Sequence, residues 1–346
     1  MRIPSTAQRS NRVAQQVSRG SRLRCLMGTE PIHVCAAVLE DAQGRVLLAR
    51  RSQGRDLAGA WEFPGGKREP GETPQQALCR ELHEELGIRV QAHDCRPLIR
   101  VPHAYPHKRI VLDVYRVGAW HGKPRGKEGQ ALAWTPGYRL GEYAMPAADL
   151  PVIAALMQPE QYLLTPATAG PLRGFAEELR VALGQGARRI QLRMPNLDGN
   201  DLREYAHLAR AVCVEFGASL LLNAHVDLAR EIGVGVHLRA AQLAAFDARP
   251  LAPELPVAAS CHNAAELARA QALGVDFVVL GPVQRTPSHP DATPLGWAAF
   301  AALREAVSLP IYAIGGMCVG DLNVARQHGA QGIAGISALW PSCGSR

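Results

Sequence analysis

The second half of this chain alternates short apolar runs with segments long enough to form helices. Eight such runs are present, at residues 161–164, 189–192, 220–222, 236–237, 257–260, 277–280, 311–314 and 333–336. Each run predicts a buried strand, and each helical segment predicts a crossover that carries the chain to the next parallel strand. Eight strand–helix units of this length predict a small (β/α)8 barrel.

The first half has a different order of elements. Apolar runs at residues 32–40 and 46–49 enclose a turn at 41–44, which predicts a β-hairpin. Further strand-like runs and one short closing helix are expected at residues 61–63, 97–101, 110–117, 131–135 and 151–157. Strands grouped around one acidic helix and a closing helix predict a mixed α/β/α sandwich.

The chain of 346 residues is longer than one ordinary domain, and its composition changes between residues 158 and 171. We therefore expect a basic extension at 1–29, a first domain at 30–157 and a barrel at 158–346. Residues 1–26 are rich in arginine and have no acidic residue and no hydrophobic core segment, which excludes a secretory signal. They superficially resemble an organellar transit peptide. The alternatives are a disordered extension and a start codon placed ahead of Met27.

Composition excludes several classes of protein. A hydrophobic fraction of 47% and a charged fraction of 20% are typical of a soluble globular protein. No apolar run approaches the length of a membrane span, so no membrane partner is expected. The net charge of +7 suits anionic substrates, but six arginines lie in the first 24 residues, and no stable nucleic-acid binding is expected. Eight scattered cysteines without a C-x-x-C pair indicate a reducing, cytoplasmic compartment and no zinc site.

Residues 66–88 have the features of a turn followed by one capped helix. Thr73 and Pro74 supply an N-cap and a first-turn proline, and Gly87 ends the helix. Leucines at every fourth position form one apolar stripe. The turn and a neighbouring helix face carry five acidic residues: Glu69, Glu72, Glu81, Glu84 and Glu85.

Such a crowded carboxylate face has two interpretations. Like charges at helical neighbour spacing repel one another and reduce stability. A hard divalent cation would neutralise them, and Mg²⁺ prefers a few carboxylates together with substrate phosphates. The alternative is a solvated acidic helix face. The charge pattern alone leaves both interpretations open.

The spacing within this segment matches the signature G-x5-E-x7-R-E-U-x-E-E-x-G-U, in which U is aliphatic. Every defined position is present: Gly66, Glu72, Arg80, Glu81, Leu82, Glu84, Glu85, Gly87 and Ile88. The chain therefore resembles the Nudix hydrolases. The resemblance implies an enzyme that cleaves a phosphoanhydride with the help of a divalent metal.

Other motifs in residues 30–157 are similar to those of the MutT-type nucleoside triphosphate pyrophosphohydrolases. They are the arginine pair before EFPGGK, the later GKEGQ and the segment MPAADLPVIAAL. The resemblance implies Mg²⁺, or Mn²⁺ in its place, held by the carbonyl of Gly65 and by Glu81, Glu84, Glu85 and Glu128. It implies catalytic roles for Glu81 as general base, for Glu84 and for Arg80, which would brace the glutamates. It places the nucleotide against Arg51, Phe63, Lys108 and Asp149.

Asp149 is a departure from that branch, which commonly has an asparagine that reads the base. An ionised carboxylate only accepts hydrogen bonds. Ordinary guanine presents a bare N7, whereas 8-oxoguanine carries N7–H, so Asp149 would still favour the oxidised base. The alternative is that Asp149 only caps the helix that follows it. The expected activity is hydrolysis of 8-oxo-dGTP to 8-oxo-dGMP and pyrophosphate, and the alternative is another Nudix diphosphatase.

Residues 158–346 resemble the thiamine phosphate synthase/TenI family. The motifs that carry the resemblance are QLRMP, LLLNAHVDLA, GVHLRAAQL, SCHN, LGPVQRTPSHP and IYAIGG. Gly315, Gly316 and Ser337 lie where such barrels bind phosphate on backbone N–H groups. His262 lies where tautomerases of this family place a histidine that could shuttle protons, and the alternative is a satisfied histidine at a strand end.

The barrel departs from this family where the synthase reaction needs charge. Pro195 and His289 stand in place of lysines, and Ala224 and Gln242 stand in place of two metal-binding aspartates. Departure of pyrophosphate requires Mg²⁺ and cations. The sequence therefore predicts a barrel that binds a thiamine-related phosphate, as a sensor or a retained site, without synthase activity. A bifunctional hydrolase and thiazole tautomerase is the alternative.

Overall fold

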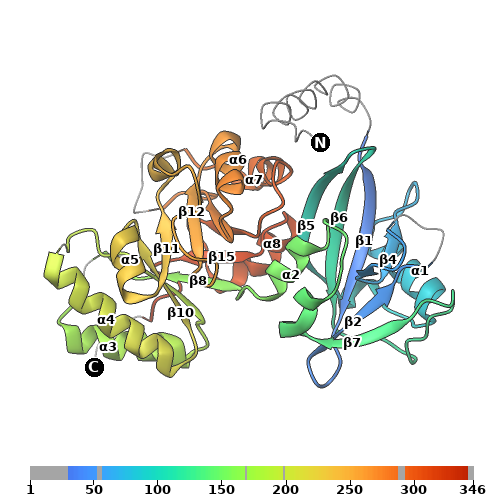
Figure 1. Ribbon diagram of the computed structural model, residues 1–346, viewed down its shortest axis with the longest axis horizontal. Coiled ribbons are helices and arrows are strands. Elements are labelled where there is room, and N and C mark those ends of the chain that lie inside the picture. Colours follow the sequence, from blue (N-terminus) through green and yellow to red (C-terminus); the bar gives the residue numbers. More distant parts are fainter. Residues whose placement is uncertain (1–29, 53–56, 168–169, 198, 287–292, 342–346) are drawn as a thin grey trace, which may run out of the picture.

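The computed structural model describes residues 30–52, 57–167, 170–197, 199–286 and 293–341. The expected extension at 1–29 and the departure at His289 lie outside the described residues. Helices and strands of the two halves form two bodies that lie side by side (Figure 1). In the part of the chain that the structure describes, no helix is both long and apolar enough to cross a membrane.

The first half contains two sheets. A four-stranded sheet has the order β4-β1-β6-β5, and a three-stranded sheet has the order β3-β2-β7. The strands are β1 (Ile32–Leu39), β2 (Arg45–Arg50), β3 (Trp61–Glu62), β4 (Gly65–Lys67), β5 (Cys95–Tyr105), β6 (Lys108–Val117) and β7 (Leu132–Pro136). The helices are α1 (Pro74–Leu86), α2 (Leu150–Leu156) and the short 3-10 helices η3 (Ala92–Asp94) and η4 (Gly137–Glu142).

The alternation of side chains along β1 builds two apolar layers. Cys35 and Ala37 pack in one cluster with Leu82 of α1. Val38 points to the opposite face and packs in a second cluster with Val152 of α2. Because successive strand residues face opposite sides, one strand separates the two helices. This arrangement confirms the mixed α/β sandwich predicted from the sequence.

The predicted hairpin at residues 32–49 is wrong. The turn forms, and the Asp41 amide donates to the Arg45 carbonyl at 3.0 Å. Only one isolated bridge, Glu40 to Val46, joins the two strands beyond it. β1 instead pairs along its whole length with β6, in parallel, while β2 enters the other sheet. Both faces of β1 are covered, and the long-range pairing with β6 outweighs the local turn signal.

The acidic helix α1 begins and ends as its sequence predicts. The Gln76 amide donates to the Thr73 hydroxyl at 3.2 Å, and the Gln76 side chain accepts from the Thr73 amide at 2.8 Å. These reciprocal bonds form a capping box, with Pro74 in the first turn. Gly87 ends the helix with a φ of 70°. The glycine is needed there because this left-handed conformation is costly for other residues.

The second half is a closed barrel of parallel strands in the order β10-β11-β12-β13-β14-β15-β8-β9. The strands are β8 (Gln161–Leu164), β9 (Arg189–Leu192), β10 (Ser219–Asn223), β11 (Gly235–Leu238), β12 (Val257–Cys261), β13 (Phe277–Leu280), β14 (Ile311–Ile314) and β15 (Gly332–Gly335). The helices are α3 (Leu172–Gly184), α4 (Gly199–Glu215), α5 (Val226–Ile232), α6 (Ala264–Leu273), α7 (Gly296–Arg304) and α8 (Leu322–Gln327), with 3-10 helices η5 (Ala240–Ala245) and η6 (Val319–Asp321). The eight-stranded barrel predicted from the apolar runs is confirmed.

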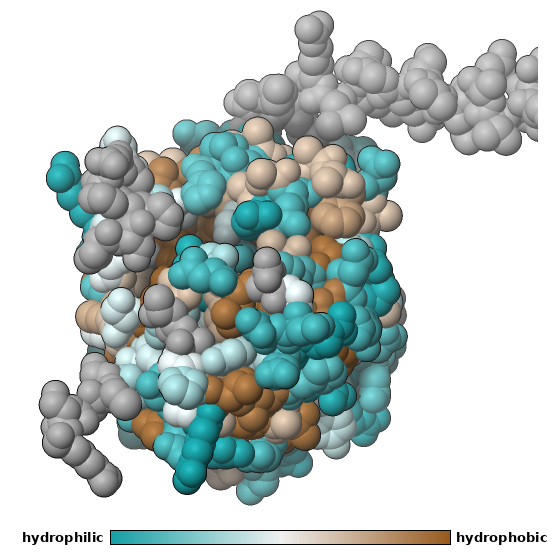
Figure 2. Space-filling view, turned by 90° about the vertical axis from the view of Figure 1, so that its left-hand side faces the viewer, coloured by the Kyte–Doolittle hydropathy of each residue, from teal (hydrophilic) through white to brown (hydrophobic). Residues whose placement is uncertain are grey.

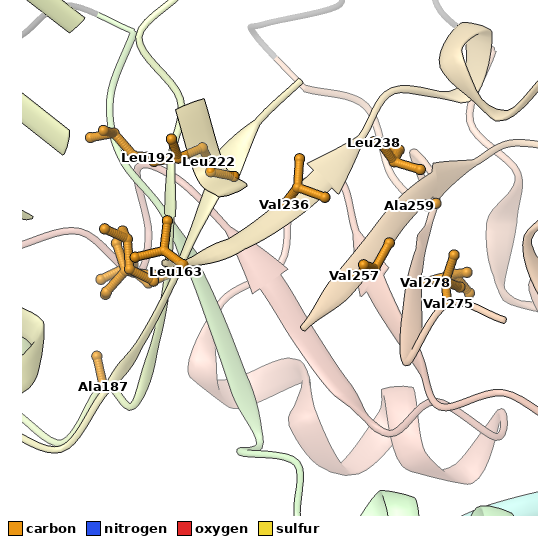
Figure 3. Packing of buried hydrophobic residues seen from close by; sticks show 14 of the residues in the cluster. Leu163, Ala187, Leu192, Leu222, Val236, Leu238, Val257, Ala259, Val275 and Val278 are labelled. Carbon is orange, nitrogen blue, oxygen red and sulfur yellow. The ribbon is translucent and has the colours of Figure 1, made fainter. Parts of the chain in front are cut away.

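Barrel strands carry apolar side chains on both faces. Leu192, Leu222 and Val236 belong to the layer between the strands and the outer helices (Figure 3). Tyr162 and Phe277 belong to a separate cluster that fills the barrel interior. Strands buried on both sides explain why these runs are continuously apolar rather than alternating.

The amino-terminal ends of the barrel strands face the first half of the chain. Tyr312 on β14 donates a hydrogen bond to the Pro159 carbonyl. The Gln331 side chain donates to the carbonyl of Ala155, in α2, at 3.1 Å. β8 starts beside α2 and runs away from it (Figure 1). The carboxyl-terminal ends of the strands, where such barrels bind ligands, therefore open on the side away from α2.

Figure 2 views the molecule from the barrel side toward which β8 runs. Hydrophilic side chains there surround several apolar patches. On the opposite side of the barrel, α8 lies beside β5 of the first half. The two halves are thus in contact through the end of the barrel that does not bear the expected ligand site.

Candidate functional site

Arg80 organises the acidic face of α1. Its guanidinium donates to Glu72 at 2.8 Å, to Glu81 at 2.9 Å and to Glu84 at 3.2 Å, with the last two bonds from the same nitrogen. The hydrogen bond from Arg80 lowers the pKa of Glu72 to about 2. A further bond to the Lys67 carbonyl, at 3.1 Å, ties this group to the loop before the helix. The structure thus brings together three of the carboxylates predicted from the signature, with Arg80 between them.

Gly66 allows the carboxylate of Glu81 to lie against the backbone of β4. A Cβ atom at this position would come within 2.4 Å of all three atoms of the Glu81 carboxylate. Any side chain would therefore displace Glu81. The signature glycine is explained by this close approach rather than by its backbone conformation.

Glu85 and Glu128 are brought toward each other by one side chain. The Gln130 amide donates to the Glu85 carbonyl at 3.1 Å, and its side-chain oxygen accepts from the Glu128 amide at 2.8 Å. The Lys127 amide also donates to the Glu85 carbonyl, at 2.9 Å. The loop that carries Glu128 therefore runs along the end of α1. Sequence spacing alone did not reveal this function of Gln130.

These residues fit a divalent cation of the kind that Nudix-like signatures imply. No three His, Cys, Asp or Glu side chains are already gathered around one point among the residues that the structure describes. The donors are nevertheless of the right chemistry, because Mg²⁺ prefers carboxylate and carbonyl oxygens and keeps several waters. Glu81, Glu84, Glu85 and Glu128, together with the Gly65 carbonyl, remain the predicted ligands.

A second group of polar residues surrounds Phe63 near the start of α2. Arg51 forms an ion pair with Glu62, and both side chains are about four-fifths buried. Phe63 is 3% exposed, and its backbone hydrogen-bonds to the Asp149 carboxylate. Arg51, Phe63 and Asp149, predicted to contact the nucleotide, therefore lie close together. Glu62 was missed, although a carboxylate inside the apolar run WEFP was a usable signal.

Asp149 is buried, with 7% of its surface exposed, and it makes no side-chain hydrogen bond that caps α2. The alternative that Asp149 only caps the helix is therefore wrong. Burial, followed by the nearby charge of Glu62, raises the pKa of Asp149 to about 7. Its carboxyl group is thus close to half-protonated at neutral pH, which lets it act as a hydrogen-bond acceptor or donor.

Tyr105 links Lys108 to this group and was also missed. The Lys108 ammonium lies 5.5 Å from the centre of the Tyr105 ring, a cation–π distance. The Tyr105 hydroxyl accepts from the Ala148 amide at 3.4 Å, next to Asp149. Burial raises the pKa of Tyr105, and the charges of Asp149, Lys108 and Arg51 all act on it. The turn between β5 and β6 therefore lies close to Asp149.

The barrel mouth retains a glycine pair after β14. A Cβ atom on Gly315 would lie 2.7 Å from Pro282 and 2.9 Å from the Val283 nitrogen. The φ angles of Gly315 and Gly316 are 104° and 70°. Only glycine allows this loop to pack so closely on the loop after β13. Ser337 is exposed and follows the adjacent strand β15, so the three predicted phosphate-binding residues lie at neighbouring strand ends.

Two of the departures from the synthase pattern are bonded to each other. The Gln242 amide donates to the Ala224 carbonyl at 3.0 Å, and its oxygen accepts from the Arg239 amide at 3.0 Å. Neither side chain is a carboxylate, and the single side-chain oxygen, on Gln242, already accepts from the Arg239 amide. Mg²⁺ requires oxygen donors, so these residues do not fit the ion that the synthase family implies.

The barrel interior holds a chain of hydrogen bonds that the sequence did not reveal. Gln191 donates to the Tyr162 hydroxyl at 3.2 Å, which lies 3.2 Å from Nδ1 of His237. Nε2 of His237 lies 2.8 Å from the Ser260 hydroxyl. Burial lowers the pKa of His237 to about 3, so the ring is neutral. Because Tyr162 accepts from Gln191, its own proton points to Nδ1 of His237, and the ring proton is on Nε2. This series of hydrogen bonds leads from the barrel core toward the mouth.

His262 follows Ser260 at the end of β12. Its Nδ1 lies 2.6 Å from the Gly281 carbonyl, and a carbonyl can only accept, so Nδ1 carries the proton. In the neutral ring Nε2 is then a base. The arrangement is compatible with proton transfer, and that function stays a prediction.

Comparison with known proteins identifies both halves. The family model described as "NUDIX domain" matches residues 35–155. The family model described as "Thiamine monophosphate synthase" matches residues 161–339. These ranges coincide with the two-sheet sandwich and with the closed barrel.

Individual relatives show the same division. An 8-oxo-dGTP diphosphatase of Haemophilus influenzae is 39% identical over 131 residues, which is 38% of this chain and 95% of that protein. A CTP pyrophosphohydrolase of Escherichia coli is 39% identical over 132 residues, which is 36% of this chain and 91% of that protein. A thiamine-phosphate synthase of Methanoculleus marisnigri is 39% identical over 181 residues, which is 51% of this chain and 86% of that protein.

Proposed function

Because the chain belongs to the Nudix hydrolases through its first half and to the thiamine monophosphate synthase family through its second, we propose a metal-dependent pyrophosphohydrolase with a modified synthase-like barrel. The hydrolase converts a nucleoside triphosphate and water to the monophosphate and pyrophosphate. The observation that carries this proposal is Arg80, which gathers Glu81 and Glu84 of α1 together with Glu72 of the preceding loop.

The residues of this face have distinct functions in the proposed reaction. Glu81 accepts a proton from the water that attacks phosphorus, while the phosphoanhydride oxygen leaves with its electron pair. Arg80 holds Glu81 in the orientation that lets it accept that proton. The divalent metal, when bound, supplies Lewis-acid polarisation of the phosphate oxygens.

The preferred substrate in this proposal is 8-oxo-dGTP. The relative named as an 8-oxo-dGTP diphosphatase supports it, and so does the position of Asp149 beside Phe63 and Arg51. The ionised carboxylate of Asp149 accepts a hydrogen bond from N7–H, which ordinary guanine does not have. Removal of this nucleotide would keep an oxidised base out of newly made DNA.

A panel of nucleotides tests this activity on the purified full-length protein. Pyrophosphate release is measured with 8-oxo-dGTP, dGTP, CTP and dCTP, with Mg²⁺ and with a chelator. The proposal expects metal-dependent release and the highest kcat/KM for 8-oxo-dGTP. Absence of release from every nucleotide would contradict the hydrolase assignment for this chain.

A cytidine triphosphate is the second candidate substrate. One relative is named as a CTP pyrophosphohydrolase and is as similar as the 8-oxo-dGTP diphosphatase. The exocyclic amino group of cytosine is a donor, and a buried carboxylate such as Asp149 accepts from it. A higher kcat/KM for CTP or dCTP in the same panel would favour this candidate.

For the barrel we propose binding of a thiamine-related phosphate ester without synthesis of thiamine phosphate. Gly315, Gly316 and Ser337 support phosphate binding, while the bond between Gln242 and Ala224 argues against a metal there. Calorimetric titration with a thiazole phosphate and a pyrimidine phosphate tests the binding. Tautomerase activity through His262 is the alternative, and loss of turnover in His262→Gln with retained binding would favour it.

A further inference from the structure

A cavity of about 210 Å³ lies where the two halves of the chain meet. From the Nudix half it is lined by Arg68, by Arg100 on β5 and by Asp113 on β6. From the barrel it is lined by Arg326 on α8 and by Gly329. We call this cavity the junction pocket. It lies on the α1 side of the sheet, because Asp113 is paired with Cys35, whereas Phe63 packs on the α2 side.

Three arginines and one carboxylate give the junction pocket a cationic lining. Arg100 lies 3.3 Å from Asp113 and 3.1 Å from Glu305, and Arg326 lies 2.7 Å from Glu160. For Arg68, the structure shows neither a side-chain hydrogen bond nor an ion pair with another described residue. Its guanidinium therefore brings a positive charge to the pocket, and none of the described carboxylates forms an ion pair with it.

Buried polar atoms without partners are concentrated at this junction. Among the described residues, such side-chain atoms include Nε of Arg326, Nη2 of Arg304 and Nδ1 of His33. Arg304 is 0% exposed and donates to the Gly329 carbonyl at 3.0 Å, while His33 accepts a backbone bond from Arg68. A buried donor without a partner destabilises the folded protein, so several together indicate a bound group.

The unpartnered atoms determine the chemistry of that group. The arginine nitrogens are donors that cannot lose their protons, so the missing partner must be an acceptor. A cation is excluded by the same argument. Asp113 does not prevent anion binding, because the positive charge of Arg100 faces it and offsets its negative charge.

We propose that the junction pocket binds a tetrahedral oxyanion of the size of inorganic phosphate, held between Arg68 of the Nudix half and Arg326 of the barrel. Planar guanidinium groups present paired N–H donors that match the oxygens of such an anion. The volume of the pocket accommodates it. The ion would join the two halves by binding the positive charges of Arg68 and Arg326, which repel each other without it.

An anion bound in the junction pocket would affect the proposed catalytic face through only a few residues. Arg68 follows Lys67, whose carbonyl accepts a bond from Arg80 at 3.1 Å. Pro74 and Gln75, at the start of α1, also line the pocket. An anion that holds Arg68 therefore restrains the loop between β4 and α1, which carries Glu72.

Hydrogen–deuterium exchange of the full-length protein tests whether phosphate binds at the junction pocket, because it locates the protected segments. Amide exchange in α8 and in residues 67–73 is measured with increasing phosphate at constant ionic strength, and in parallel with sulfate and pyrophosphate. The proposal expects slower exchange in both segments with phosphate. Sulfate as effective as phosphate would identify a general oxyanion site, whereas protection by pyrophosphate alone would overturn the proposed ligand size.

Arg68→Gln is the informative variant, because the half-buried side chain makes no bond that the fold requires. It should weaken the phosphate-dependent protection at least tenfold. Arg173→Gln removes a charge from exposed α3 and serves as the matched control, with unchanged protection expected. Equal protection in Arg68→Gln and the unmodified protein would overturn the proposal, because the phosphate would then act from the barrel mouth or the nucleotide pocket.

Crystals soaked in selenate provide a second measurement. An anomalous peak between Arg68 and Arg326 is expected, and its loss in Arg326→Gln would support the assignment. An ordered water cluster in place of the peak would overturn it. Nucleotide hydrolysis is not needed for either readout, so failure of this proposal and failure of the hydrolase proposal are distinguishable.

Discussion

Gln242 and Ala224 join two loops of the barrel mouth through a single hydrogen bond of 3.0 Å. Ala224 has a φ of 72°, a left-handed conformation that aspartate and asparagine adopt more readily than alanine. The backbone has therefore kept a shape suited to a carboxylate residue, although the carboxylate is gone. The amide of Gln242 now makes the connection that a shared ion would otherwise provide.

We therefore expect no thiamine phosphate from the full-length protein with Mg²⁺ and the synthase substrates. The double variant Ala224→Asp, Gln242→Asp should bind one more equivalent of Mn²⁺ than the unmodified protein, because it restores two oxygen donors at this place. Electron paramagnetic resonance of Mn²⁺ measures the stoichiometry. The single variant Gln242→Asp is the control. Thiamine phosphate formation by the unmodified chain would contradict the expectation.

Glu85→Gln should lower kcat for pyrophosphate release by about 100-fold or more, a loss typical of a group that acts on transition-state charge. The carboxylate is buried beside the Glu128 loop, and its amide replacement is a weak metal ligand. Glu142→Gln, an exposed carboxylate paired with Arg139, is the matched control. Near-normal turnover of Glu85→Gln at low Mg²⁺ would show that this residue does not bind the metal.

Discrimination between 8-oxo-dGTP and dGTP should increase with pH. The pKa of Asp149 is about 7, so the carboxylate form, which accepts from N7–H, predominates above neutrality. Below pH 7 the protonated form also donates to the bare N7 of ordinary guanine. The ratio of kcat/KM values should rise about tenfold between pH 6 and pH 8.5, which corresponds to roughly one hydrogen bond. A ratio that does not change with pH in this range would exclude Asp149 as the reading group.

Asp149→Asn should stabilise the substrate-free protein at pH 8. The folded pKa of Asp149 lies above its usual value of 3.8, so between those values the unfolded chain loses a proton that the folded protein keeps. Stability consequently falls as pH rises from about 4 to 7, and the asparagine removes this loss. The expected gain in the free energy of unfolding at pH 8 is on the order of 2–4 kcal/mol, with little gain at pH 4.

Denaturant unfolding at both pH values measures that gain. Asp41→Asn is a control of opposite sign, because hydrogen bonds from Arg45 lower the pKa of Asp41 and its carboxylate form is the stabilising one. Asp41→Asn should therefore reduce stability at neutral pH. Equal stability of Asp149→Asn and the unmodified protein at pH 8 would show that ionisation of the buried carboxyl does not destabilise the folded protein.

The strands of the barrel could be predicted from sequence because both faces of each strand are buried. The runs at 161–164, 189–192, 277–280 and 311–314 coincide with the bounds of β8, β9, β13 and β14. The pairing of the first two strands could not be predicted from their burial. A turn signal is local, whereas the pairing of β1 with β6 depends on residues more than seventy positions apart.

The site was predictable where function requires a fixed spacing along one helix. Arg80, Glu81 and Glu84 are neighbours through helical periodicity, and the structure places them together. Tyr105 and His237 come from strands whose neighbours are set by the tertiary fold, so their side chains carried no recognisable local signal. The ion pair of Arg100 with Glu305 joins the two halves, and no pattern within either half predicts it.

The direction of the barrel strands has a consequence for metabolism. Since their amino-terminal ends meet the Nudix half, the mouth opens on the side of the barrel away from that half. A product of one half would have to diffuse through bulk solvent to reach the other, in competition with every other enzyme that uses it. The covalent fusion thus fixes a one-to-one ratio of the two domains rather than the transfer of an intermediate between them.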